Sequence, residues 1–194
     1  MGFDERIGPK FLDAGLRWGG SCLPKGLAAL HSFAKKVGSG TGLVDDVVSI
    51  NQRQAGKAAE FARAALGTLE RKHIAVLGIV FKPETDDLRD AVSIPVVNSL
   101  VQSGASVTIW DSRAMIGAQR IFGDRVKYAT NALDCLEGAD CCILVTESPE
   151  FKDLKPRTFV QKMRKPIVDG RRVYDPVEFT GAGRLLVIGL GPED

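Results

Sequence analysis

Between Gly26 and Leu69, apolar residues recur every three or four positions, which is the spacing of amphipathic helices. The segment LAALHSFAKKV (27–37) has this pattern and ends at a glycine-rich break, GSGTG (38–42). A second stretch, residues 44–69, is long, Ala-rich and amphipathic, with Gly56 and Gly67 as its weak points. GSGTG lacks the Lys-Ser/Thr of a phosphate-binding loop and follows no strand, so we interpret it as a linker.

From His73 onward the pattern changes to short, continuous apolar runs, most of them rich in β-branched residues. Continuous runs are typical of strands buried on both faces, as in a parallel sheet. Between the first two runs, SIPVVNSLVQSG (93–104) has the pattern of a compact helix closed by a glycine. The repeated order of strand, helix and strand predicts a doubly wound α/β fold. The runs are HIAVLGIVF (73–81), ASVTIWD (105–111), DCCILVTE (140–147), KPIVDGR (165–171) and RLLVIGL (184–190).

The two patterns divide the chain into a helical segment, 1–70, and an α/β domain, 71–194. Hydrophobic content of 44% and charged content of 26% are typical of a globular protein with a core. The net charge is only +2 and the basic residues are spread along the chain, which argues against a nucleic-acid or membrane partner and fits a small anion. With no apolar run of transmembrane length and no apolar leader after Met1, we expect a cytoplasmic protein.

The loop after the first apolar run, VFKPETDDLRDA (80–91), is a candidate ligand site because doubly wound sheets bind ligands beyond the carboxyl ends of their strands. It is not a dinucleotide fingerprint, since the chain contains no GxGxxG. Lys82 and Arg89 flank acidic residues there and are spaced to hold two parts of a phosphorylated ligand. The alternative is a solvated turn with local ion pairs. Ser93 or Asp90 is the expected cap of the following helix.

Cys22 lies in GGSCLPKG (19–26) and is a candidate nucleophile. A nearby cation, Lys25, and a helix beginning near Pro24 would both favour its thiolate. A small buried cysteine is the alternative. The other cysteines, Cys135, Cys141 and Cys142, are expected to be free thiols, with Cys142 a core residue in the run CCILV. The spacing of cysteines and histidines gives no reason to expect a metal site.

Five blocks in this chain resemble the nucleotide-sugar dehydrogenases, in particular the UDP-glucose 6-dehydrogenases. They occur in order and at suitable spacing over nearly the whole chain: RIGPKFL (6–12), WGGSCLPK (18–25), VVSINQRQ (47–54), LGIVFKPETDDLRDA (77–91) and DGRRVYDP (169–176). The resemblance implies a Rossmann-like UDP-binding domain after a helical central segment. Complete members begin with an NAD-binding domain, and this chain starts past it.

The resemblance also implies a reaction. Such enzymes oxidise the C6 alcohol of UDP-glucose to a carboxylate with two NAD⁺. Cys22 matches the residue that attacks the C6 aldehyde to give a thiohemiacetal, which is then oxidised to a thioester that water cleaves. Lys25 is carried over with it as the second catalytic residue.

Further roles follow from the resemblance by position. Arg6 matches an arginine that reaches the nucleotide sugar of a neighbouring subunit, and Lys82 matches a lysine at the sugar end of the pocket. Arg89 is directed to the cofactor, and Arg171 to the nucleotide. The helix at 44–69 matches the element that builds a homodimer. The loop from Phe11 to Gly20, which includes Trp18 and Gly19, matches the segment that wraps the UDP-sugar.

Two departures from the family pattern bear on turnover. Gly26 stands where an aspartate normally follows the lysine, and Arg17 stands where the loop normally has glycine. These changes put turnover in doubt. Because the family's NAD-binding domain and a further catalytic lysine and asparagine come from upstream, we expect this chain to be inactive on its own. The alternatives are a non-catalytic UDP-sugar-binding or dimerisation module, and a relative acting on GDP-mannose or UDP-N-acetylmannosamine. A thiol hydrolase is more distant, because neither His31 nor His73 is placed by the sequence as a base for Cys22.

Overall fold

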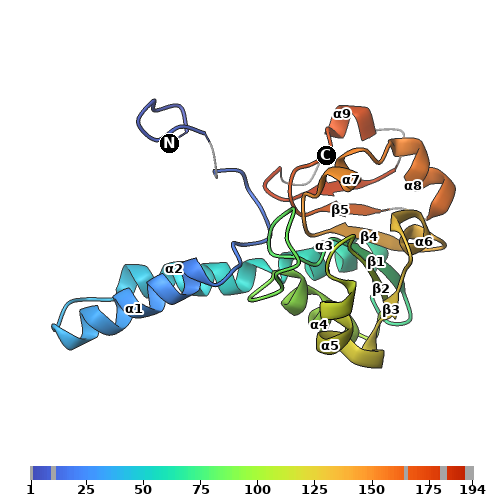
Figure 1. Cartoon of the computed structure of the whole chain (residues 1–194). Helices are drawn as coiled ribbons and strands as arrows, with labels where there is room; N and C mark the ends of the chain where they lie inside the picture. The colour runs from blue at the N-terminus through green and yellow to red at the C-terminus, as the bar shows by residue number, and fades with distance from the viewer. Residues whose placement is uncertain (1, 10–11, 164–165, 180–182, 191–194) are drawn as a thin grey trace.

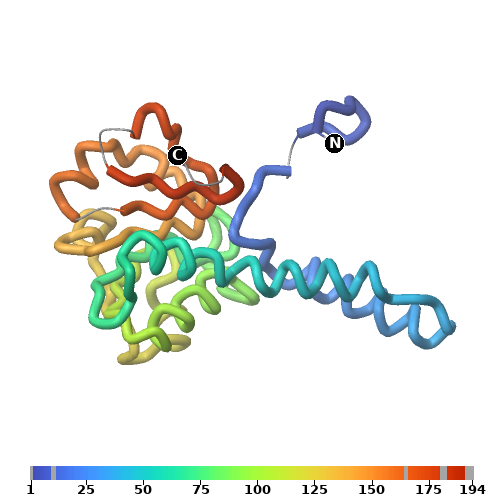
Figure 2. Tube along the Cα trace, turned by 180° about the vertical axis from the view of Figure 1, so that it is seen from behind, coloured from blue at the N-terminus to red at the C-terminus, as the bar shows by residue number. Residues whose placement is uncertain are grey.

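The computed structural model describes residues 2–9, 12–163, 166–179 and 183–190. In it, a helical hairpin projects as an arm from an α/β body (Figure 1). The arm consists of α1 (Cys22–Lys36) and α2 (Gly42–Gln54), joined by the GSGTG linker, and α3 (Lys57–Leu66) continues from α2 into the body. The view from behind shows the same projection, with α2 and α3 following one line (Figure 2).

The single helix expected over residues 44–69 is interrupted. The chain forms a turn at Ala55 and Gly56, where the Gly56 N–H donates to the carbonyl of Arg53, three residues back, in place of the helical i−4 partner. Gly67, with φ of 77°, ends α3. The two glycines singled out in the sequence are therefore the two places where the helical pattern stops.

The body is a six-stranded sheet in which every paired strand is parallel, in the order β3-β2-β1-β4-β5-β6. The predicted doubly wound fold is confirmed, and the strand order is that of a Rossmann sheet. The strands are β1 (His73–Leu77), β2 (Ser106–Trp110), β3 (Lys127–Tyr128), β4 (Cys141–Leu144), β5 (Ile167–Asp169) and β6 (Leu185–Val187). The sequence analysis missed β3, whose two residues carry no apolar run.

Helices cover both faces of the sheet. They are α4 (Ser93–Gln102), α5 (Met115–Phe122), α6 (Ala132–Leu136), α7 (Pro149–Lys152), α8 (Pro156–Lys162) and α9 (Pro176–Phe179), with a 3-10 turn, η1 (Gly123–Arg125). One core packs α3, α4 and α5 on the face that carries Ile74, Val76, Cys141 and Ile143. The other packs α6 to α9 on the face that carries Ala75, Leu77, Cys142 and Leu144. Successive residues of a strand point to opposite faces, so each strand contributes to both cores.

The predicted cap of α4 is wrong. Val92, rather than Ser93 or Asp90, is the N-cap residue of α4, and no side chain caps it. The Ser93 hydroxyl instead donates to the carbonyl of Ile79, which connects α4 to the loop after β1.

The predicted boundary between the helical segment and the α/β domain, at residues 70 and 71, stays a prediction. Because α3 buries Ala58, Ala59 and Ala62 in the body, contacts extend across it.

Candidate functional site

The loop before Cys22, residues 14–20 (the cysteine loop), lies against the α/β body. Leu16 is fully buried, and its N–H donates to the carbonyl of Gly170 at the end of β5, at 3.2 Å. Only glycine fits at position 170, because a Cβ there would lie 2.4 Å from the Leu16 side chain. Gly19 and Gly20 contact the loop between β1 and α4, at Asp90 and Phe81 respectively. The cysteine loop is thus fitted to the carboxyl edge of the sheet.

Helix α2 holds the same loop from the other side. The Asn51 side chain accepts a hydrogen bond from the Trp18 N–H at 3.1 Å and donates to the Trp18 carbonyl at 3.4 Å. The Gln54 amide donates to the carbonyl of Gly15 at 2.9 Å. Both residues belong to the block VVSINQRQ (47–54), so this block positions the cysteine loop through their hydrogen bonds. The sequence analysis assigned no role to Asn51 or Gln54.

Arg17 joins the cysteine loop to the β1–α4 loop. Its guanidinium pairs with the Asp90 carboxylate at 2.7 Å and donates to the Asp90 carbonyl at 3.2 Å. The Arg17 side chain is only 10% exposed, and its Nε has no hydrogen-bond partner among the described residues. The φ of Arg17 is +155°, in a region that favours glycine. Arg17 therefore combines a backbone conformation that favours glycine with a partly buried ion pair, in which the Asp90 side chain is 41% exposed.

Cys22 is the first residue of α1 and is exposed, unlike the other three cysteines. All four are free thiols, as predicted. The helix begins two residues before Pro24, so the thiol lies in its first turn, where N–H groups lack helical partners. Burial raises the pKa of Cys135 and Cys141 to about 12, and burial also raises the pKa of Cys142. Cys22 is thus the thiol available for chemistry.

Three cations belong to the segments around Cys22, and one of them, Arg89, interacts with its charge. Arg89 forms a two-oxygen pair with Asp87, which raises the pKa of the Arg89 guanidinium, and the charge of the Cys22 thiolate raises it further. The hydrogen bond from Arg89 lowers the pKa of Asp87 to about 2. Lys82 is exposed, with its Nζ 5.3 Å from the centre of the Phe81 ring that packs on Gly20. Lys25 is exposed on α1, three residues after the thiol.

Arg171 makes two hydrogen bonds within the chain, and its expected contact with the nucleotide stays a prediction. Its Nε donates to the Val145 carbonyl at 2.7 Å, and its Nη1 donates to the Arg17 carbonyl at 3.2 Å. Burial lowers the pKa of this guanidinium, while Glu147 raises it. Arg171 therefore connects β4 to the cysteine loop. Beneath it, the fully buried Asp169 accepts from the backbone N–H groups of residues 171, 173 and 174.

Arg6 does not join this cluster. It pairs with Asp4 at 2.7 Å on an exposed N-terminal turn, and that turn lies away from the arm and the sheet edge (Figure 1). Phe11 lies outside the described residues. The histidines are occupied elsewhere: His31 pairs with Asp45 of α2 at 2.9 Å, and His73 bonds to Thr108 at 2.8 Å.

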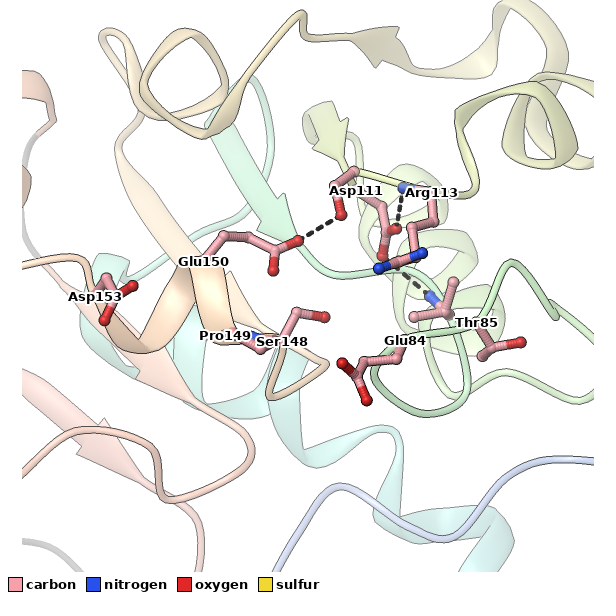
Figure 3. Close-up of a pocket in the computed structure, with 10 residues that line it drawn as sticks. Glu84, Thr85, Asp111, Arg113, Ser148, Pro149, Glu150 and Asp153 are labelled. Atoms are coloured by element: carbon pink, nitrogen blue, oxygen red, sulfur yellow. Dashed lines mark hydrogen bonds between the residues drawn. The ribbon is translucent and has the colours of Figure 1, made fainter.

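Two cavities flank the site. A groove of about 480 Å³ runs between α1 and α2 and is lined in part by Arg17, Trp18 and Asp90. A crevice of about 350 Å³ opens at the carboxyl ends of β1, β2 and β4, with Asp111 and Ser148 in its wall (Figure 3). Cys22 lines neither of these two cavities. Within the described ranges, no group of three or more His, Cys, Asp or Glu side chains is placed to hold a metal ion.

Family models match both parts of the chain. Residues 1–53 match the central domain of the UDP-glucose/GDP-mannose dehydrogenase family, and residues 75–176 match the UDP-binding domain of that family. The chain belongs to this family. The resemblance found in the sequence is confirmed, and it now rests on the fold as well as on the five blocks.

Individual relatives agree with this assignment. UDP-glucose 6-dehydrogenase TuaD of Bacillus subtilis is 35% identical over 202 residues, covering 100% of this chain and 44% of the relative. AglM of Haloferax volcanii, also a UDP-glucose 6-dehydrogenase, is 37% identical over 89% of this chain and 40% of its own length. A UDP-glucose dehydrogenase structure from Pyrobaculum islandicum superposes with a TM-score of 0.84 at 32% identity, covering 97% of this chain and 41% of that one. The chain thus spans less than half the length of these relatives. No helix in the described ranges is long and apolar enough to cross a membrane.

Proposed function

We propose that this chain is the central and UDP-binding portion of an NAD-dependent nucleotide-sugar 6-dehydrogenase that oxidises UDP-glucose to UDP-glucuronate. The observation that carries the proposal is the exposed thiol of Cys22 in the first turn of α1, beside a loop that supplies Arg89 and Lys82. UDP-glucose is proposed as the substrate because the relatives are UDP-glucose 6-dehydrogenases by name.

The chemistry assigned to Cys22 is covalent catalysis. Its thiolate adds to the C6 aldehyde of the sugar, a C–S bond forms, and the carbonyl oxygen takes a proton to give a thiohemiacetal. Positive charge from Arg89 and Lys25, and the free N–H groups of the first turn of α1, favour the thiolate and the developing oxyanion. Oxidation of the thiohemiacetal to a thioester removes a hydride and a proton, and NAD⁺ bound outside this chain would take the hydride. Water would then cleave the thioester and return the thiol and a carboxylate.

The UDP-sugar is proposed to lie along the cysteine loop, with Lys82 at the sugar end and backbone groups around Trp18 and Gly19 as partners. Arg171 is proposed to hold this loop in place, because its guanidinium donates to the backbone carbonyls of Val145 and Arg17. Arg6 is proposed to serve the site of a neighbouring subunit, which fits its distance from the cysteine loop of its own chain (Figure 1).

The residues of this chain do not fit the NAD cofactor. In a Rossmann sheet, the first β–α turn presents free N–H groups to the pyrophosphate. Here the N–H groups of Ile79 and Val80 are bonded to the Asp111 carboxylate. We therefore propose that NAD is bound by a part of the protein outside these 194 residues, and that this chain alone binds UDP-sugar without turnover.

The test combines activity with calorimetry. With UDP-glucose and NAD⁺ we expect no sustained rise in absorbance of the reduced cofactor, and titration with UDP-glucose should still release or absorb heat. Cys22→Ala should retain that heat, while Arg171→Leu should lose it because the loop is no longer held. Turnover by this chain alone would contradict its proposed inactivity, and the absence of binding by any UDP-sugar would contradict the function.

A homodimer through the arm is part of the proposal. The arm carries six large apolar side chains that are more than half exposed: Leu23, Leu30, Phe33, Val37, Leu43 and Ile50. Large exposed apolar surface is typical of an interface. Phe33→Lys together with Leu43→Lys should shift the chain to a monomer in light scattering without changing its fold. A concentration of about 0.1 mM is high enough to populate even a weak dimer. A wild-type chain that is monomeric at this concentration would contradict the proposed homodimer.

A non-catalytic module is the second candidate, and the departures at positions 17 and 26 favour it. A Cβ added at Gly26 would meet no heavy atom within 4 Å outside its own turn of helix, so the missing aspartate would point into open space. Restoring it by Gly26→Asp in a protein completed with an NAD-binding domain separates the candidates. A gain in thioester hydrolysis on the order of 10²-fold, as expected for an acid–base group, favours the enzyme. No activity with or without the aspartate favours the module.

A further inference from the structure

The loop after β1, residues 78–92, is acidic where it borders the cysteine loop. It carries four carboxylates against two cations, Lys82 and Arg89. Arg89 already pairs with one of these carboxylates, that of Asp87, at 2.7 Å. The thiolate of Cys22 is a further negative charge in the same region, since it interacts with the charge of Arg89. An uncompensated carboxylate of this loop would therefore oppose the thiolate, and an anionic ligand as well.

Arg17, from the cysteine loop, neutralises a second carboxylate, that of Asp90. Its guanidinium donates to Asp90 Oδ1 at 2.7 Å and to the Asp90 carbonyl at 3.2 Å, and within the described ranges these are the hydrogen bonds that connect the two loops. The loops are also in close contact, because a Cβ at Gly19 would lie 2.6 Å from the Asp90 carbonyl oxygen. Cys22 follows Gly19 by three residues. The charge of Asp90 is thus compensated from the segment that carries the thiol.

The burial of Arg17 makes its charge effective and its contribution to folding small. The Arg17 side chain is only 10% exposed, so water and salt screen its charge less than that of a surface cation. Its Nε is buried without a hydrogen-bond partner among the described residues, and its φ of +155° favours glycine. Both features offset part of what the ion pair contributes to stability. We therefore expect the effect of Arg17 in the charge around Cys22 more than in the stability of the fold.

Both loops are fixed by contacts that do not use the Arg17 side chain. In the cysteine loop, Leu16 is fully buried, and its N–H is bonded to the carbonyl that follows β5. In the other loop, Leu88 and Ala91 are buried on either side of Asp90. Loss of the Arg17 side chain should therefore release a negative charge rather than a loop.

We propose that Arg17 is a positioning residue that acts through Asp90: by neutralising this carboxylate it favours the thiolate of Cys22 and the binding of an anionic nucleotide sugar beside it. The part of the inference that concerns the nucleotide sugar rests on the proposed function. The part that concerns the thiol does not, and it is measured without a substrate.

The experiment measures alkylation of Cys22 in the full chain, at low ionic strength, with anionic iodoacetate and with neutral iodoacetamide. The ratio of the two rates reports the charge around the thiol, because a change in access alone affects both reagents alike. Arg17→Gly, which suits the backbone at this position, should lower the ratio of iodoacetate to iodoacetamide about threefold. Arg17→Lys should retain it. In about 1 M salt the difference between Arg17→Gly and the wild type should disappear, because the Debye length is then only about 3 Å.

A second substitution separates the loss of charge from the loss of contact. Arg17→Gly combined with Asp90→Asn restores the net charge without restoring the ion pair, so the ratio should return to that of the wild type. Lys162→Gln is the matched control, because it removes the cation of an ion pair with Glu137, also 2.7 Å long, elsewhere in the body, and it should leave the ratio unchanged. An unchanged ratio in Arg17→Gly, or a double variant that keeps the low ratio, would overturn the proposal.

Protection by UDP-glucose tests the part that rests on the proposed function. UDP-glucose should protect Cys22 from iodoacetamide, and half-protection of Arg17→Gly should need about threefold more of it than the wild type or the double variant. Equal protection of the wild type and Arg17→Gly would overturn the effect on the ligand. Absence of protection in every variant, with the alkylation ratios as expected, would contradict the proposed function and support the role of Arg17 at the thiol.

Discussion

The arm and the body of this protein are built from similar local patterns but are stabilised in opposite ways. Helix α4 of the body buries Val96, Val97 and Leu100 against the sheet. Helix α1 of the arm buries none of its residues, and Leu43 at the start of α2 is 80% exposed. Amphipathic spacing is therefore enough to form a helix but does not tell what covers its apolar face. The body supplies its own cover, whereas the arm leaves its apolar side chains exposed.

The largest effect should come from crowding the body. In Gly170→Val, the new side chain would meet Leu16 and the Leu144 carbonyl at less than 3 Å, so we expect a loss of about 2–3 kcal/mol in the free energy of unfolding. Urea denaturation measures it. The matched change in the arm is Gly26→Ala, which meets nothing within 4 Å and should stabilise α1 by up to about 1 kcal/mol. Equal losses at both sites would contradict the contrast between arm and body.

Thiol labelling contrasts the two regions directly. At pH 8, Cys22 should react with iodoacetamide at least about 10²-fold faster than the three body cysteines, because burial raises the thiol pKa of Cys135 and Cys141 to about 12 and also blocks access. Peptide mapping by mass spectrometry locates the label. In urea all four should react. Labelling of a body cysteine at the rate of Cys22 in the native protein would show that the body is less closed than described.

The ion pair of Arg17 and Asp90 joins the cysteine loop to the body, and substitution of one partner should cost more stability than substitution of the other. Asp90→Asn leaves the buried Arg17 guanidinium without its carboxylate, and we expect a loss of about 1–2 kcal/mol. Arg17→Gly removes the same pair but relieves the positive φ, so it should cost less than about 1 kcal/mol. Thermal unfolding of both variants gives the comparison. A greater loss in Arg17→Gly than in Asp90→Asn would mean that the backbone of Arg17 is not strained.

The smallest effect concerns the exposed pair of Asp87 and Arg89. The pKa of Asp87 is lowered to about 2 by its hydrogen bond from Arg89, so the pair stabilises the folded state above the unfolded pKa of about 4 and stops doing so as the pH falls through 2. The difference in urea midpoint between the wild type and Asp87→Asn should be small at pH 7 and should vanish near pH 2. A difference that grows on acidification would contradict the assigned sign.

Much of the body was predictable because its strands are continuous apolar runs, whose burial on both faces needs no knowledge of partners. Strand β3, residues Lys127–Tyr128, was not, because two residues paired at an edge leave no pattern. The glycines, the proline and the cation around Cys22 left an exposed nucleophile and a buried cysteine both open, and the structure shows the thiol exposed. Contacts between distant positions were not: Arg17 and Asp90 are 73 residues apart, and no local rule connects them.

The same limit applies to residues that act through the backbone. Asp111 and Asp169 look like catalytic or ligand carboxylates at strand ends, yet each accepts hydrogen bonds from three backbone N–H groups of neighbouring turns. Arg171 looks like a phosphate-binding arginine, and in the fold it also donates to two backbone carbonyls. At such positions the sequence shows only the residue type, and the fold is needed to show which groups the side chain hydrogen-bonds to.

One consequence follows from where the cysteine loop is attached. Asn51 and Gln54 hold it on the arm side of the turn at Ala55 and Gly56, while Gly170 and Asp90 hold it on the body side. The loop therefore braces the joint between α2 and α3, where the helical hydrogen bonds are interrupted. Bending at that joint would have to break one set of these bonds, so a seven-residue strap, residues 14–20, fixes the angle at which the whole arm leaves the sheet.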